Sequence, residues 1–194
     1  SGFMLLQKKM IDKEISNLKA IDTLIRQEQP FAVYRIPGEK IPCLVTQEEG
    51  AVRLIYDLQE LNGQRGFVIA PFRPNETCPI LLIQSNGPGQ PLLLADDADA
   101  VPRDIPSTDY PSCSEEYAEC FRTFISALRD KTFEKLVLSR KLTIGKPSAF
   151  SPSLAFRAAC QRYIHSYIYL CYTPQTGIWL GSTPEIILSG EKDD

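Results

Sequence analysis

Short runs of apolar and β-branched residues, each followed by turn-forming residues, constrain the fold of this chain more than any other feature. In the first half of the chain these runs occupy residues 31–36, 43–46, 52–56, 67–72 and 80–84. Clusters of Gly, Pro and Asn separate them, and the first run ends at Pro37-Gly38, where proline fixes φ and glycine tolerates positive φ. This spacing is typical of strands joined by turns. We therefore predict an antiparallel sheet over this half.

Two segments carry the periodicity of amphipathic helices. Residues 8–27 hold apolar side chains three and four positions apart, on one stripe, and Pro30 ends the segment. Ser112 and Glu115 form a capping-box pattern ahead of a second apolar stripe. That pattern predicts a second helix over residues 114–129.

A third helix and a hairpin are predicted near the C-terminal end. Ser151 suits the N-cap position and Pro152 the first helical position, so a helix is expected from here to about Tyr163. Alternating or β-rich runs then predict a hairpin that continues into another strand, over residues 167–172, 178–180 and 185–188.

The connecting segments divide the chain. Residues 85–111 are rich in Pro, Gly and Asp with few apolar positions, which is typical of a long loop or linker. Residues 135–144 alternate between apolar and polar side chains, which predicts a strand with one polar face. We therefore expect two regions, residues 1–110 and 111–194.

Composition and charge exclude several classes of protein. With 43% hydrophobic and 23% charged residues, the chain has the composition of a folded globular protein. Its 21 Lys and Arg against 24 Asp and Glu give a net charge of -3, so no basic face is expected for nucleic acid. The apolar runs are far shorter than the roughly 20 residues of a membrane-spanning helix. We expect neither nucleic acid nor a membrane as a partner.

The cysteines and the histidine bear on the compartment and on metal binding. Six cysteines are scattered without a C-x-x-C pair, and His165 is the single histidine, which argues against a zinc site. The first apolar stretch is too short for a secretory signal. We interpret the cysteines as reduced thiols and expect a cytoplasmic protein.

Three segments of the second half form a recognisable combination. The sequence K-L-V-L-S-R at residues 135–140 follows the second predicted helix, and G-S-T-P-E at residues 181–185 closes the predicted hairpin. A helix, K-x-V-L-S-R, another helix and a hairpin leading into G-S-T-P-E occur in this order in the chorismate-utilising enzymes. The chain resembles that family over about residues 110–190, and isochorismate synthase most closely.

The resemblance implies an α+β fold, with a mainly antiparallel sheet and packed helices, of the chorismate-binding (ADC synthase-like) type. Residues 1–110 would be a variable N-terminal sheet-forming region, and residues 111–194 the first part of the catalytic region. Family members continue well past G-S-T-P-E, so we expect an incomplete, N-terminal portion of that fold. Such a portion would expose sheet edges through which it self-associates.

The resemblance also assigns roles to two side chains. Lys135 would be the general base and Glu185 the general acid as water adds at C2 of chorismate and the C4 hydroxyl leaves. Hydroxide is a poor leaving group, so the carboxyl group needs a raised pKa and the amine a lowered pKa. Without the motifs, both residues would be interpreted as solvated surface groups. Arg140 stays outside the catalytic set, and Ser139 lacks the partners of a hydrolase triad.

Several alternatives remain open at this point. Family members that aminate chorismate usually lack lysine at the position of Lys135, so this residue favours addition of water. Salicylate synthases share the lysine and go on to eliminate pyruvate, and they remain an alternative with other chorismate-utilising enzymes. A non-catalytic binding domain on the same scaffold is an alternative of a different class. Menaquinone and siderophore biosynthesis are both open as the pathway that the product serves.

Magnesium is the cofactor that the resemblance implies. Bound Mg²⁺ would offset the negative charge of chorismate and so help to keep the pKa of Lys135 low. The family's metal-ligating glutamates follow the G-S-T-P-E segment, so we assign no metal ligand in this chain. The chain is therefore expected to be inactive by itself.

Overall fold

The computed structural model describes residues 16–47, 50–85, 87–94, 115–141, 143–146, 148, 150–185 and 190. It divides the chain into two compact units, residues 1–101 with 151–194 and residues 102–150. The boundary expected near residue 110 lies outside the described residues. The first unit combines strands from before and after that point, so it does not follow the expected division into two consecutive regions.

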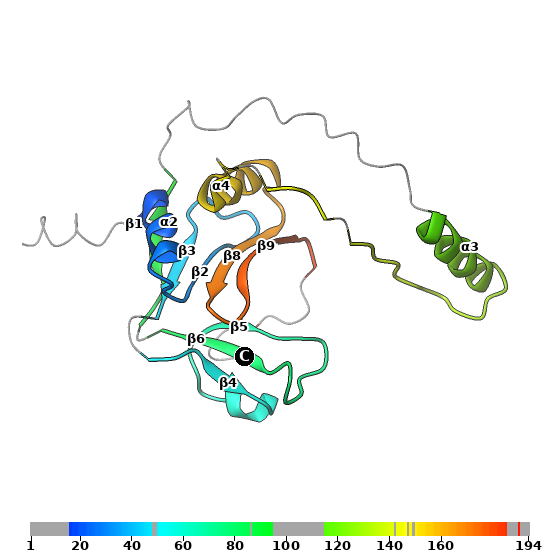
Figure 1. Cartoon of the computed structure of the whole chain (residues 1–194), viewed down its shortest axis with the longest axis horizontal. Coiled ribbons are helices and arrows are strands. Elements are labelled where there is room, and N and C mark those ends of the chain that lie inside the picture. The colour runs from blue at the N-terminus through cyan, green and yellow to red at the C-terminus, as the bar shows by residue number, and fades with distance from the viewer. Residues whose placement is uncertain are drawn as a thin grey trace, which may run out of the picture. The chain divides into compact units, whose positions relative to one another are not determined.

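A six-stranded sheet is the main element of the first unit (Figure 1). In order across the sheet, its strands are β1 (Ser16–Asn17), β7 (Gln90–Leu93), β3 (Cys43–Thr46), β2 (Phe31–Arg35), β8 (Tyr167–Thr173) and β9 (Gly177–Thr183). All neighbouring strands are antiparallel except β1 and β7, which are parallel. Since β2 pairs with both β3 and β8, segments far apart in the sequence share one ladder.

A smaller sheet of three antiparallel strands belongs to the same unit. Its order is β4 (Arg53–Ile55), β6 (Ile80–Gln84) and β5 (Gly66–Ile69). A single 3-10 turn, η1 (Leu58–Leu61), follows β4 and begins with a capping box in which Asp57 accepts a hydrogen bond from the amide of Gln59. Together the two sheets confirm the prediction of an α+β fold that is mainly antiparallel.

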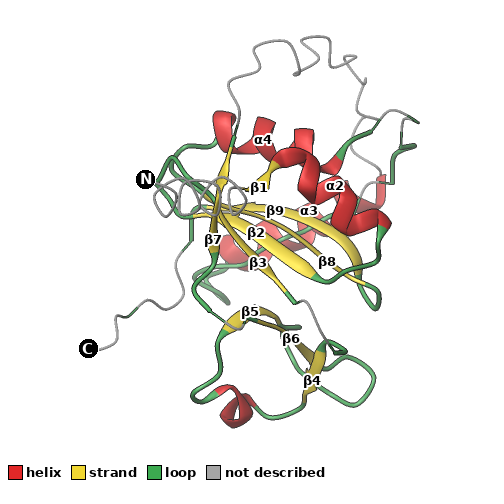
Figure 2. Ribbon diagram, turned by 90° about the vertical axis from the view of Figure 1, so that its left-hand side faces the viewer, coloured by secondary structure: helices red, strands yellow, loops and turns green. Residues whose placement is uncertain are grey.

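Two helices cover one face of the six-stranded sheet. These are α2 (Leu18–Arg26) and α4 (Pro152–Arg162), and Figures 1 and 2 show them on the side opposite the three-stranded sheet. As predicted, Ser151 is the N-cap of α4, and its hydroxyl accepts a hydrogen bond from the amide of Leu154 at 3.3 Å. The hydroxyl of Ser153 donates to Asp22 Oδ2 at 2.7 Å and so links α4 to α2.

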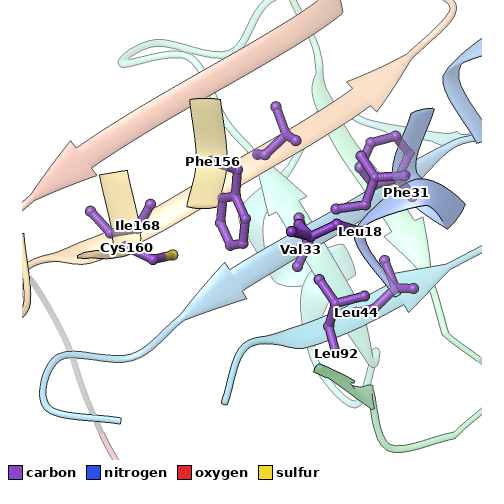
Figure 3. Packing of buried hydrophobic residues seen from close by; sticks show 10 residues of the cluster. Leu18, Phe31, Val33, Leu44, Leu92, Phe156, Cys160 and Ile168 are labelled. Carbon is purple, nitrogen blue, oxygen red and sulfur yellow. The ribbon is translucent and has the colours of Figure 1, made fainter. Parts of the chain in front are cut away.

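The main core lies between these helices and the sheet. Figure 3 shows the ring of Phe156 extending from α4 toward the sheet, where β2 carries Phe31 and Val33. All three side chains are fully buried. Burying an apolar side chain of this size stabilises a fold by about 1.5–3 kcal/mol, so this layer is a main source of stability. The complete cluster is Leu18, Ile21, Phe31, Val33, Leu44, Leu92, Phe156, Cys160, Ile168 and Leu170.

A second, smaller core joins the two sheets. Because side chains alternate along a strand, Ala32 and Cys171 point away from the helices. They pack with Val45 and with Ile83 of the three-stranded sheet, and all four are buried. The central strands β2 and β8 therefore supply side chains to both cores.

The second unit contains α3 (Glu115–Arg129), which confirms the helix predicted over residues 114–129; Ser112 of its expected capping box lies outside the described residues. None of the residues of α3 is buried.

The strand predicted over residues 135–144 is wrong, because the described residues of this segment form neither helix nor strand. Alternation selects the side that a strand would bury, but a strand also needs a hydrogen-bonding neighbour, and no strand is described in this unit.

Two other predictions need correction. The first helix was expected over residues 8–27, but it begins at Leu18, and Ser16–Asn17 pair with β7 as a strand. Residues 8–15 lie outside the described part of the chain. Gln90–Leu93 form β7 inside the segment predicted to be a loop. Hydrogen bonding to β3 and β1 stabilises this strand, and its four residues alone are too short a pattern to predict it. The strand expected over residues 185–188 falls mainly on residues that are not described.

Within the described ranges, no helix is long and apolar enough to cross a bilayer.

Candidate functional site

The β8–β9 hairpin places Glu185, the expected general acid. Tyr169 pairs with Gly181 and Tyr167 pairs with Thr183, which is the last pair of the ladder. The first three residues of the G-S-T-P-E segment therefore belong to β9, and Pro184 and Glu185 follow the strand. The hydroxyl of Thr183 accepts a hydrogen bond from the backbone amide of Glu185 at 3.2 Å. This bond fixes the turn after β9, and the side chain of Glu185 is exposed. This carboxyl group is therefore accessible from solvent.

Gly181 has a structural reason to be glycine. The ring of Tyr169, its partner on β8, lies directly over it, and a Cβ atom at position 181 would clash with that ring. Packing of an aromatic ring across a glycine is a known way to stabilise a strand that lacks a side chain. The first residue of the G-S-T-P-E segment therefore holds a tyrosine against the sheet, four residues before Glu185.

Lys135, the expected general base, belongs to the second unit, whereas Glu185 belongs to the first. Lys135 is exposed; it follows α3 and is the first residue of the K-L-V-L-S-R segment. In the same unit the guanidinium of Arg140 lies over the ring of Tyr117, 5.7 Å from its centroid, which is a cation–π contact. The acid–base roles of Lys135 and Glu185 stay predictions.

Metal ligands were not expected in this chain. Among the described residues, no group of three or more His, Cys, Asp or Glu side chains is arranged to hold a metal ion. The role of Mg²⁺ rests on the resemblance alone.

A cavity of about 820 Å³ lies between the two sheets of the first unit, and no sequence pattern predicts it. Aromatic rings form much of its wall. The rings of Tyr34 and Phe67 stack with centroids 6.0 Å apart, and Tyr34 and Tyr167 stack at 5.7 Å. The ring of Tyr169 lies 6.2 Å from Phe67 and 6.3 Å from Tyr167, and Trp179 of β9 completes the aromatic lining.

The register of the strands explains how these rings meet. Tyr34 lies opposite Tyr169 across β2 and β8, and Trp179 lies opposite Cys171 across β8 and β9. Cross-strand partners point to the same face of a sheet, so rings from three strands gather on one side. The alternating tyrosines at 167 and 169 could have indicated an aromatic face on β8. Phe67 comes from the other sheet, and no local sequence pattern predicts its contact with these rings.

Burial raises the pKa of the tyrosine hydroxyls in this wall above their ordinary value. It raises the pKa of Tyr34 to about 12, with a smaller contribution from a hydrogen bond with the Cys43 side chain. Burial also raises the pKa of Tyr167 and of Tyr169. The thiol of Cys171, which also lines the cavity, has its pKa raised to about 11 by burial. The described lining residues include no Asp, Glu, Lys, Arg or His.

Comparison of the chain with models of protein families, with curated proteins and with solved structures finds no match.

Proposed function

We propose that this chain is part of an isochorismate synthase, which converts chorismate to isochorismate. The observation that carries the proposal is the arrangement around G-S-T-P-E: a regular β8–β9 hairpin ends at Thr183, and the exposed Glu185 follows at once. The K-L-V-L-S-R segment, with exposed Lys135, stands before it in the order that the chorismate-utilising enzymes share. The proposed acid and the proposed base are both accessible to a substrate.

In the proposed reaction Lys135 takes a proton from water as the water oxygen forms a bond to C2 of chorismate. Both ring double bonds shift, C1=C2 to C1=C6 and C5=C6 to C4=C5, and the bond from C4 to its hydroxyl breaks. Glu185 donates its proton to that hydroxyl, which leaves as water, so that one water enters and one departs. Mg²⁺ would supply charge compensation for the substrate carboxylates. The described residues contain no group that fits the metal, so no step is assigned to it.

The test is an assay of chorismate consumption with Mg²⁺, on protein that contains the complete catalytic region. Lys135→Ala and Glu185→Gln should each lower kcat at least about a hundredfold, because general acid–base groups contribute about 10²–10⁴ in rate. Lys141→Ala and Glu39→Gln are matched controls, since both residues are exposed and lie outside the proposed set. Activity that survives Lys135→Ala would remove lysine from the role of base.

The same assay distinguishes the alternatives by their products. Isochorismate alone supports the proposal, whereas salicylate with pyruvate indicates a salicylate synthase. Absence of turnover in protein with the complete region indicates a binding domain on the same scaffold.

A further inference from the structure

The aromatic cavity between the two sheets does not suit the proposed substrate. Chorismate carries two carboxylates, and transfer of an unpaired carboxylate out of water is strongly unfavourable. The described lining offers tyrosine and threonine hydroxyls and aromatic faces, but no Lys, Arg or His side chain. The cavity therefore suits a ligand of different chemistry. Thr183 both lines it and accepts the hydrogen bond from the amide of Glu185, so the cavity adjoins the proposed acid.

We propose that this cavity is a second site, which binds a flat, uncharged aromatic compound of about two fused rings. Its volume of about 820 Å³ lies within the range of about 300–1,000 Å³ that is typical of small-molecule sites. Its wall holds the rings of Tyr34, Phe67, Tyr167, Tyr169 and Trp179. Aromatic rings prefer offset-stacked or edge-to-face contacts with other rings, so the wall favours a planar ligand over a saturated one.

Contacts within the protein already hold the walls of the cavity in place before a ligand binds. The small core of Ala32, Val45, Ile83 and Cys171 joins the sheets behind the cavity, and Phe67 and Tyr169 pack against it. On the outer side, the indole Nε1 of Trp179 donates to the carbonyl of Thr176 at 3.0 Å, which fixes the orientation of the ring. A site with walls already in place loses little conformational entropy on binding.

A set of three related ligands tests this site on the full chain by isothermal titration calorimetry. Coumarin is flat and uncharged, coumarin-3-carboxylate adds one negative charge, and octahydrocoumarin has the same skeleton without aromatic rings. Coumarin should bind at least about tenfold more tightly than the other two. Trp179 is the single tryptophan of the chain, so its emission, corrected for absorption by the ligand, should change as coumarin binds.

Two neighbouring residues of β9 provide a matched pair of variants. Trp179 lines the cavity, whereas Ile178 is partly exposed on the opposite face of the same strand. Trp179→Ala should weaken coumarin binding about threefold to tenfold, as expected for loss of one aromatic pair, and Ile178→Ala should leave it unchanged. Ile178 is 41% and Trp179 55% exposed, and neither side chain belongs to a core cluster.

A charge added at the rim gives an independent test with a gain of binding. Ala70 lines the cavity and is exposed, so Ala70→Arg should tighten binding of coumarin-3-carboxylate by about threefold. Ala51→Arg, at an exposed position outside the lining, is the control. The proposal is overturned if coumarin does not bind, if octahydrocoumarin or the carboxylate binds equally well, or if Trp179→Ala behaves like Ile178→Ala.

Discussion

The two faces of the six-stranded sheet differ although the same strands build both. The face under α2 and α4 holds ten buried side chains in one cluster, most of them aliphatic. The face toward the three-stranded sheet holds a buried cluster of four, and partly buried aromatic rings surround it. The first face is closed by helices, and the second leaves a cavity of about 820 Å³. One face therefore mainly stabilises the fold, and the other has room for a small ligand.

The largest expected effect compares one phenylalanine from each face. Phe156→Ala should lower the free energy of unfolding by about 3–5 kcal/mol, because it empties a fully buried position under α4. Phe67→Ala, which removes a partly buried ring beside the cavity, should have a clearly smaller effect. Urea unfolding measures both. Phe72→Ala is the control, since that ring is 99% exposed. Equal effects for Phe156 and Phe67 would break the distinction between the faces.

Arg35 lies on the helix-covered face and can be compared with an exposed arginine of the three-stranded sheet. Its buried guanidinium donates hydrogen bonds to four backbone carbonyls, those of Glu39, Tyr163, Ile164 and Ser166, at 2.6–3.3 Å. Arg35→Met leaves these acceptors without their donor, and should lower the free energy of unfolding by about 2–4 kcal/mol.

The matched variant is Arg53→Met. Arg53 forms an exposed ion pair with Glu60 at 3.5 Å, and such pairs contribute about 0–1 kcal/mol. Urea unfolding should therefore separate the two arginines clearly. A similar small effect at both would show that the carbonyls near Arg35 find water instead.

Gly181 tests the packing of the cavity face. Gly181→Ala should lower the free energy of unfolding by about 1–3 kcal/mol, because the new methyl group clashes with the ring of Tyr169. Combining it with Tyr169→Ala should remove most of the penalty, so the two effects will not add. Gly87→Ala is the control, since open space surrounds that glycine. Additive effects would mean that the ring moves aside freely.

The smallest expected effect is on the dependence of stability on pH. Burial raises the pKa of Tyr34 from 10.0 to about 12, so the folded state favours the protonated phenol. Its contribution is fully present below about pH 10 and is lost as the pH rises toward 12. Tyr34→Phe should therefore reduce the loss of stability over this range, as measured by urea midpoints at several pH values. An unchanged slope would indicate that the phenol is solvated.

Local patterns predicted much of the fold. The helix at Pro152–Arg162 follows from Ser151 and Pro152, and the hairpin follows from the β-rich runs that flank Gly177, which has φ of +71°. Such signals lie within a few residues of the element they specify. The predictions failed where order depends on distant partners: β1 and β7 are short, and they pair with each other across most of the first half of the chain.

The candidate site divides in the same way. Glu185 was assigned from a motif of five consecutive residues; it follows the predicted hairpin directly, and its role as acid stays a prediction. The cavity was missed because its rings come from positions 34, 67, 167, 169 and 179 on four strands of two sheets. Only the register of those strands brings them together, and register depends on tertiary packing.

The position of β2 between β3 and β8 has a consequence for synthesis of the chain on the ribosome. Pairing with β3 becomes possible as soon as the first turn emerges, but pairing with β8 waits for a segment that comes much later; Arg35 and Ile164, which it bonds, are 129 positions apart. Until then one edge of β2 and the apolar side of Phe31 and Val33 lack their final neighbours. A nascent chain paused within residues 102–150 should therefore depend on chaperones more than the finished protein does.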